Sequence, residues 1–135
     1  MVDYITGING IGKTRLLAQA AIAAAESSKG NVIYIDCSDK LNLELPSNIR
    51  LINAKDYAID GAIALYGFLL GLCASDYDLT DVFIDSTHKM ISYDNTNIND
   101  FMEIVTKASS STGVNFHFSV CDVSERELVY QDVME

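Results

Sequence analysis

The chain has 135 residues, of which 49% are apolar, and its formal net charge is −10. This length predicts a single domain, residues 1–135, with an ordinary hydrophobic core. Nucleic acids and anionic membranes both attract basic surfaces, and here nine Lys and Arg stand against nineteen Asp and Glu. Direct nucleic-acid binding and membrane docking are therefore not expected. The most apolar run, residues 62–74, is too short to cross a bilayer, so no membrane insertion is expected either.

The cysteines Cys37, Cys73 and Cys121 are far apart and form no C-x-x-C or Cys/His group. Their odd number and wide spacing argue against a disulfide framework or a zinc site. Each lies in an apolar run, which is typical of a buried free thiol. Free thiols suit a reducing compartment, and no basic leader precedes the first strand, so we expect a cytoplasmic protein.

Strand patterns and helix patterns alternate along the chain. In order, they predict a strand at 2–6, a helix at 14–28, strands at 31–37 and 48–53, a long helix at 56–74, a strand at 81–86, a helix at 97–109 and a strand at 114–121. The strands lack polar alternation, which indicates cover on both faces. The predicted fold class is therefore α/β: a three-layer α/β/α sandwich with a mostly parallel sheet.

Two details concern the helices. On the first, the residues expected on the inner face are Leu16, Leu17, Ala20, Ala21 and Ala24. On the second, Gly67 and Gly71 lie one turn apart, and this spacing predicts close packing against a neighbour.

The segment GINGIGKT, residues 7–14, separates the first strand from the first helix. It matches G-x-x-x-x-G-K-[ST], in which glycines let backbone N–H groups surround phosphates at a helix N-terminus. Lys13 is predicted to reach the β- and γ-phosphates, and the Thr14 hydroxyl to ligate magnesium. The predicted nucleotide-binding residues are Gly7, Asn9, Gly10, Ile11, Gly12, Lys13, Thr14 and Arg15.

A second element of such a site is an apolar strand that ends in a metal-holding acid. DVFIDS, residues 81–86, supplies it, with Asp85 as the acid. The alternative is an aspartate that caps the following turn. Together with Thr14, Asp85 is predicted to hold Mg²⁺.

These motifs resemble those of the P-loop NTPases, and among them most closely the RecA/KaiC-type ATPases, over residues 1–121. NVIYIDCSD resembles their second strand with its acidic end, and DVFIDS resembles their Walker B strand. The resemblance implies a minimal P-loop NTPase fold in which residues 114–121 lie between the P-loop strand and the Walker B strand. Because the chain is short for this superfamily, the P-loop strand is expected at a sheet edge. The resemblance also implies a polar sensor on the fourth strand, with Ser119 as first candidate and His117 as second.

The catalytic acid departs from the family pattern. RecA-type enzymes place a glutamate after the second strand, where this chain has Ser38, flanked by Asp36 and Asp39. Lys13, Asp36 and Asp39 are therefore the candidate catalytic residues. Ser86 follows Asp85, so the Walker B glutamate of other ATPases is missing. No guanine-specific N-K-x-D is found, so ATP is expected rather than GTP.

Three functions remain open from the sequence. The first is a small ATPase that binds Mg-ATP and hydrolyses it slowly, activated by homo-oligomerisation or a protein partner. The second is a nucleotide-binding regulatory module with negligible hydrolysis. The third, a small-molecule kinase, is disfavoured because only three arginines and no lid-sized insertion are present.

Overall fold

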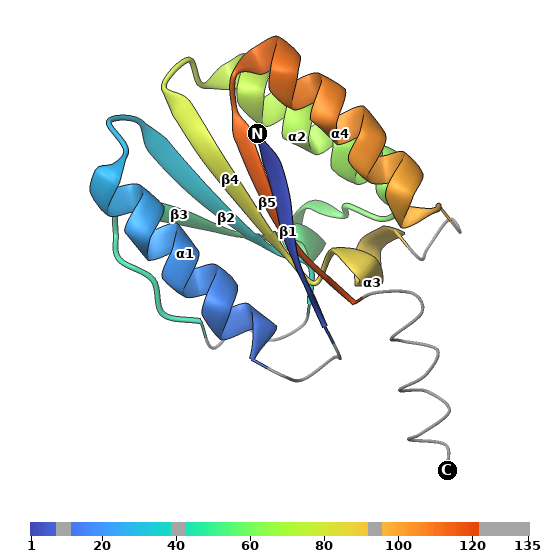
Figure 1. Ribbon diagram of the computed structural model, residues 1–135, viewed down its shortest axis with the longest axis horizontal. Coiled ribbons are helices and arrows are strands. Elements are labelled where there is room, and N and C mark those ends of the chain that lie inside the picture. Colours follow the sequence, from blue (N-terminus) through green and yellow to red (C-terminus); the bar gives the residue numbers. More distant parts are fainter. Residues whose placement is uncertain (8–11, 39–42, 92–95, 122–135) are drawn as a thin grey trace.

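The computed structural model describes residues 1–7, 12–38, 43–91 and 96–121, whose strands form one parallel sheet (Figure 1). The strands are β1 (Val2–Gly7), β2 (Asn31–Asp36), β3 (Ile49–Asn53), β4 (Leu79–Asp85) and β5 (Asn115–Cys121). The helices are α1 (Lys13–Ser27), the 3₁₀ helix η1 (Ala54–Tyr57), α2 (Ala62–Ser75), α3 (Thr87–Ile91) and α4 (Ile98–Thr112).

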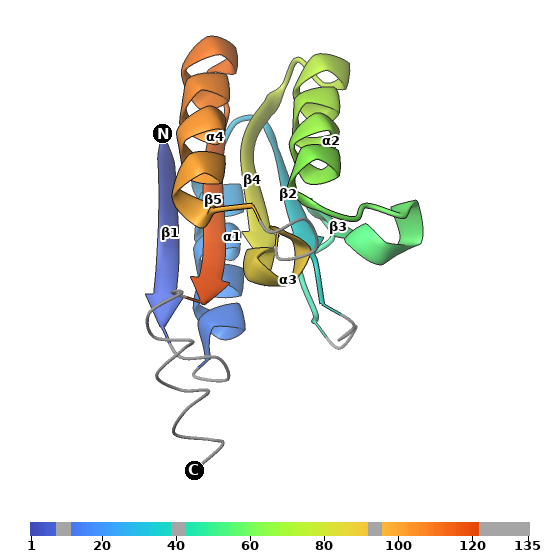
Figure 2. The same cartoon turned by 90° about the vertical axis from the view of Figure 1, so that its right-hand side faces the viewer.

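The sheet order is β1-β5-β4-β2-β3, as Figure 2 shows from one edge to the other. β5 therefore lies between β1 and β4, which confirms the expected position of residues 114–121 between these two strands. Among the described strands β1 is the outermost on its side of the sheet, also as expected. All four strand pairs are parallel, so the carboxyl ends of the strands meet at one side of the sheet.

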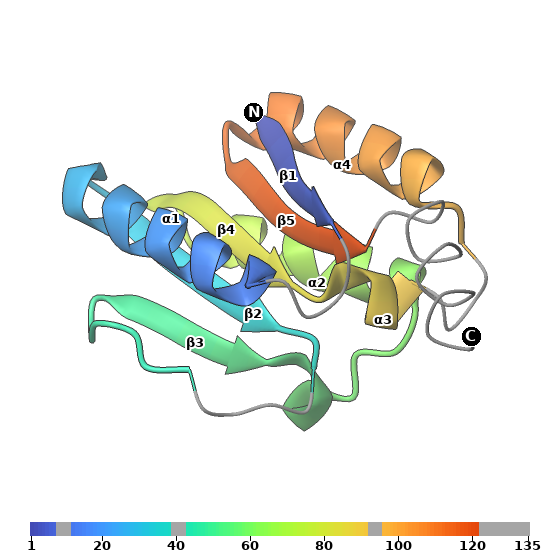
Figure 3. The same ribbon diagram turned by 60° about the horizontal axis from the view of Figure 1, so that its bottom comes forward.

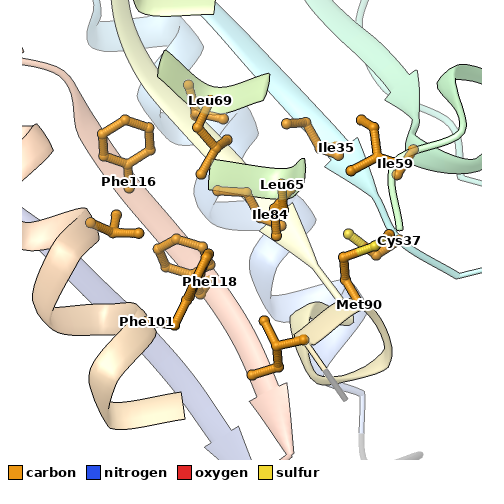
Figure 4. Packing of buried hydrophobic residues seen from close by; sticks show 14 of the residues in the cluster. Ile35, Cys37, Ile59, Leu65, Leu69, Ile84, Met90, Phe101, Phe116 and Phe118 are labelled. Atoms are coloured by element: carbon orange, nitrogen blue, oxygen red, sulfur yellow. The ribbon is translucent and has the colours of Figure 1, made fainter. Parts of the chain in front are cut away.

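Helices cover both faces of the sheet, which confirms the three-layer α/β/α architecture (Figure 3). Leu17, Ala18 and Ala21 of α1 pack on Tyr34 and other residues of one face. α2 and α4 cover the opposite face, where Phe101 meets Phe118 edge to face at 5.8 Å between ring centroids (Figure 4). Successive strand residues point to opposite faces, so each central strand contributes to both layers of core.

The predicted long helix at 56–74 is wrong at its start. Residues 54–57 form η1, and Ala58 and Gly61 have φ of 53° and 89°, which a continuous α-helix does not allow. The α-helix begins only at Ala62, after this turn. α4, by contrast, has clear local signals: the Asn97 side chain accepts hydrogen bonds from the Asn99 and Asp100 amides, and Gly113 ends it with φ 77°.

Two details of helix packing also differ from expectation. Leu16 is 47% exposed and Ala20 is exposed, because α1 is turned so that Leu17, Ala18 and Ala21 face the sheet. Gly67 and Gly71 are exposed on α2, and a Cβ atom at either would meet nothing within 4 Å among the described residues. The prediction of close packing at these glycines is therefore wrong. None of the helices in the described ranges is both long and apolar enough to pass through a membrane.

Candidate nucleotide-binding site

The site residues are placed by the carboxyl ends of β1, β2 and β4. Gly7 is the last residue of β1, Gly12 precedes α1, and Lys13 and Thr14 are its first two residues. Asp36 and Asp85 are the last residues of β2 and β4, and they are register partners in neighbouring strands. The fold therefore brings Gly7, Gly12 and the two predicted acids to the same side of the sheet, where the strands have their carboxyl ends (Figure 1).

The N-terminus of α1 has the properties of an anion site. Gly12 has φ 69°, a left-handed conformation that glycine adopts without strain. The first helical turn carries no acidic residue, and its N-cap Gly12 has no side chain that could accept from the first N–H groups. Lys13 is only 8% exposed and brings a positive charge to this point. Backbone donors, a helix dipole and a buried ammonium fit a phosphate group.

Asp85 is only 3% exposed, and donors from both neighbouring strands hold its carboxylate. Ser119 of β5 donates to Oδ1 over 2.5 Å, and Tyr34 of β2 donates to Oδ2 over 3.1 Å. The Ser119 oxygen also accepts the backbone N–H of Ser86 over 2.8 Å. Ser86 itself has φ 60°, so the chain turns sharply where it leaves β4. A buried, oriented carboxylate of this kind fits a role beside a hydrated magnesium ion.

Asp36 is 5% exposed and lies beside Asp85. Ser38 donates twice to its Oδ1, from the backbone N–H over 2.8 Å and from the hydroxyl over 2.7 Å. Burial raises the pKa of Asp36, and the charge of Asp85 acts in the same direction. The two Ser38 hydrogen bonds and the charge of Lys89 oppose this rise in pKa. Two negative charges on the paired residues Asp36 and Asp85 repel each other and are unfavourable for folding.

Several predicted residues cannot be placed. Asn9, Gly10, Ile11 and Asp39 lie outside the described residues. Thr14 and Arg15 are placed, and both are exposed on the first turn of α1.

The described ranges contain no group of three or more His, Cys, Asp or Glu that could hold a metal ion. Magnesium in a nucleotide site needs no such group, because one or two protein ligands, water and phosphate oxygens complete its coordination.

Sequence reasoning missed two features of this edge. Tyr34 was read only as a buried strand residue, yet its hydroxyl reaches Asp85. The sequence carries no signal for this contact, because it depends on the register of β2 with β4, in which Tyr34 pairs with Phe83 and Asp36 with Asp85. The short helix α3, directly after Asp85, was also missed. It begins at Thr87, whose hydroxyl donates to the Ile84 carbonyl over 3.2 Å.

The two sensor candidates have different surroundings. Ser119 contacts Asp85 directly. His117 lies two residues earlier in β5, between Asp3 of β1 and Asp81 of β4. Its Nδ1 is 2.7 Å from Asp3 Oδ1, its Nε2 is 2.8 Å from Asp81 Oδ2, and its ring stacks on Phe83 at 4.3 Å. His117 is therefore occupied in a cross-strand cluster away from the carboxyl ends of the strands.

Cys37, next to Asp36, is 1% exposed, and burial raises its pKa to about 12. Its thiol therefore stays protonated at neutral pH and unreactive. Its backbone N–H donates to the Asp85 carbonyl over 3.1 Å, which extends the pairing of β2 and β4 one residue beyond the end of β2. This confirms the expectation of a buried cysteine at this position.

Comparison with known proteins gives a result at the level of the fold. No protein family matches the sequence, and no curated protein matches it either. Among solved structures, the chain is similar to the flagellar accessory protein FlaH from Methanocaldococcus jannaschii, with a TM-score of 0.64 and 16% sequence identity. The match covers 98% of this chain and 66% of the FlaH chain, just under two thirds of its length. The chain therefore shares its α/β fold with this protein, and the likeness reaches no further than the fold.

Proposed function

We propose that this protein binds Mg-ATP on the loop between β1 and α1 and hydrolyses it slowly, with activation by oligomerisation or a protein partner. The observation that carries the proposal is the buried Lys13 at the N-terminus of α1, at the same side of the sheet as the buried Asp85 at the carboxyl end of β4. The G-x-x-x-x-G-K-[ST] pattern and the P-loop NTPase-like fold support it independently.

Each residue has a role that follows from its chemistry. The α1 amides and Lys13 would bind the β- and γ-phosphates. Thr14 and Asp85 would hold magnesium, which neutralises charge on the phosphates when it is bound. Asp36, whose pKa is raised by burial, is the described candidate for orienting the attacking water. Asp39 remains the second candidate for this role.

The chain lacks the glutamate that would activate the attacking water, because none directly follows Asp36 at the end of β2 or Asp85 at the end of β4. This is why we infer slow turnover in the isolated protein and completion by a second copy or a partner. A carboxylate or an arginine supplied across an interface would accelerate phosphoryl transfer, as arginine fingers do in related chemistry.

A second function is favoured by the hydrogen bonds of Asp36. Both Ser38 donors bind the same carboxylate oxygen, so this acid has a local structural role at the end of β2. If that is its only role, the protein is a nucleotide-binding regulatory module that hydrolyses ATP negligibly. A partner would then detect the nucleotide-bound state.

The test is phosphate release from ATP with magnesium, measured over a wide range of protein concentration, together with the affinity for a fluorescent ATP analogue. Lys13→Ala is the blank, and Lys107→Ala, on the exposed side of α4, controls for the loss of one positive charge. We expect a specific rate that rises with protein concentration and a loss of nucleotide affinity of at least about 100-fold only in Lys13→Ala.

The other outcomes separate the two functions. Nucleotide binding without turnover above the blank favours the regulatory module. Asp36→Asn and Asp39→Asn should slow turnover and spare binding if one of them is the catalytic acid. Equal nucleotide affinity in wild type and Lys13→Ala would refute both functions.

A further inference from the structure

We propose that Tyr34 is a positioning residue for the metal-holding carboxylate of Asp85, working as a pair with Ser119 on the opposite side of that carboxylate. This inference rests on the proposed function, because it concerns the magnesium of the nucleotide site. It adds Tyr34 of β2 to the site residues that the sequence predicted.

The backbone register explains how Tyr34 reaches Asp85. Tyr34 pairs with Phe83 on the neighbouring strand, and the two rings are nearly parallel, with centroids 6.5 Å apart. Asp85 is the next residue of β4 on the same face, so it is the diagonal neighbour of Tyr34, within reach of a long aromatic side chain. The hydroxyl ends 3.1 Å from Asp85 Oδ2.

Burial makes this hydrogen bond matter. Tyr34 is fully buried, and Asp85 is 3% exposed, so little water is available to replace either partner. A buried carboxylate is costly unless hydrogen-bond donors surround it. A hydrogen bond from a hydroxyl to a carboxylate is stronger than a hydrogen bond between two neutral groups. Within the described part of the chain, the Tyr34 hydroxyl donates to Asp85 and makes no other hydrogen bond.

The two donors act on different oxygens. Ser119, on β5, donates to Oδ1, and Tyr34, on β2, donates to Oδ2. The carboxylate is therefore held by the strands on both sides of β4. Each oxygen has a second lone pair, and the donors therefore leave acceptor capacity for a metal-bound water. Groups that orient a metal-holding residue in this way typically change metal affinity 10- to 100-fold when they are removed.

Tyr34→Phe is the sharpest variant, because it removes one oxygen atom and keeps the buried ring and its contact with Phe83. The measurement is the magnesium concentration that half-saturates binding of a fluorescent ATP analogue, and the affinity for the same analogue in EDTA. We expect the half-saturating magnesium concentration to rise about 10-fold in Tyr34→Phe, with the affinity in EDTA unchanged. Tyr66→Phe, a half-buried tyrosine of α2 on the other face of the sheet, is the matched control.

A double-mutant cycle separates positioning from a general structural effect. If Tyr34 acts through Asp85, Tyr34→Phe changes the magnesium dependence in the wild type and has no further effect in Asp85→Asn. Ser119→Ala removes the donor to the other oxygen and provides the same test if Tyr34→Phe does not fold. Thermal unfolding without ligand shows whether each variant is folded.

The outcomes distinguish this inference from the proposed function. A wild-type protein that does not bind the ATP analogue contradicts the proposed function itself. Magnesium-dependent binding in the wild type with an unchanged magnesium requirement in Tyr34→Phe overturns only the role of Tyr34. An equal loss of affinity in EDTA, or an effect that persists in Asp85→Asn, also overturns it, since the residue would then act on the fold rather than on the carboxylate.

Discussion

Two polar clusters lie on the face of the sheet that α1 covers, and their positions along the strands differ. The edge cluster, Tyr34, Asp36, Asp85 and Ser119, is at the carboxyl ends of the strands, beside the N-terminus of α1. The clamp, Asp3, His117 and Asp81, crosses β1, β5 and β4 nearer their amino ends.

The charges of the two clusters are arranged in opposite ways. In the clamp, a histidine lies between two carboxylates, and both ring nitrogens are within hydrogen-bond distance of an oxygen. In the edge cluster, Asp36 and Asp85 are adjacent, and like charges oppose each other. The clamp therefore stabilises the pairing of the outermost strand β1 with the rest of the sheet. The edge cluster, at the carboxyl ends of the central strands, instead keeps two like charges together where α/β folds bind ligands.

The largest effect on stability is expected from the clamp. His117→Phe retains an aromatic ring against Phe83 but leaves Asp81, which is 9% exposed, without its partner. We expect the free energy of unfolding to fall by about 2–3 kcal/mol. Urea denaturation measures this change, and nucleotide affinity should stay within a factor of two of the wild-type value.

A second substitution tests the physical reason. Asp81→Asn should destabilise the wild-type protein, and in the His117→Phe background it should recover part of the lost stability, because it removes the unpaired charge. The clamp interpretation fails if Asp81→Asn is equally destabilising in both backgrounds.

A smaller effect of opposite sign is expected from Asp36→Asn. The folded-state pKa of Asp36 is raised above the reference value of 3.8, mainly by burial, so ionising this carboxyl group costs folding free energy. The cost is absent below the unfolded pKa, where the group is protonated in both states, and is fully present above the folded pKa. Asn keeps an oxygen that accepts from Ser38, and the variant should therefore be more stable than wild type at pH 7.

Chemical denaturation as a function of pH checks this sign. The stability advantage of Asp36→Asn should shrink as pH falls through the folded pKa and vanish below about pH 3.8. Asp60→Asn, at an exposed loop position, controls for the loss of one negative charge. A variant that is less stable than wild type at pH 7 would show that the negative charge of Asp36 is paired in the folded protein.

The smallest effect is expected outside both clusters, at Gly71 on α2. This glycine is exposed in the helix interior, and an added Cβ would meet nothing within 4 Å in the described part of the chain. Gly71→Ala should raise the free energy of unfolding by about 0.5–1 kcal/mol, because alanine has less freedom to lose when the helix forms. Denaturant titration measures it. Destabilisation instead would point to a neighbour that packs on this face of α2.

The accuracy of the sequence predictions depended on how local each signal was. α4 was placed well because the Asn97 side chain caps its start and Gly113, with positive φ, ends it. The start of α2 was misplaced because residues 56–61 are compatible with a helix, and only the turn at Ala58 and Gly61 interrupts it. The inner face of α1 was only partly right, since alanine is apolar enough to face either way, and packing on Leu17 and Ala21 decided the rotation.

The sequence by itself determined the phosphate loop pattern, the alternation of strands and helices, and the acids at the ends of β2 and β4, because these are properties of short segments. Only the tertiary structure decided which side chains meet. Strand order and register place Ser119 and Tyr34 on the two oxygens of Asp85, and they place His117 between two carboxylates instead of at the site. Residues far apart in sequence become neighbours through the pairing of whole strands, and no local pattern encodes that pairing.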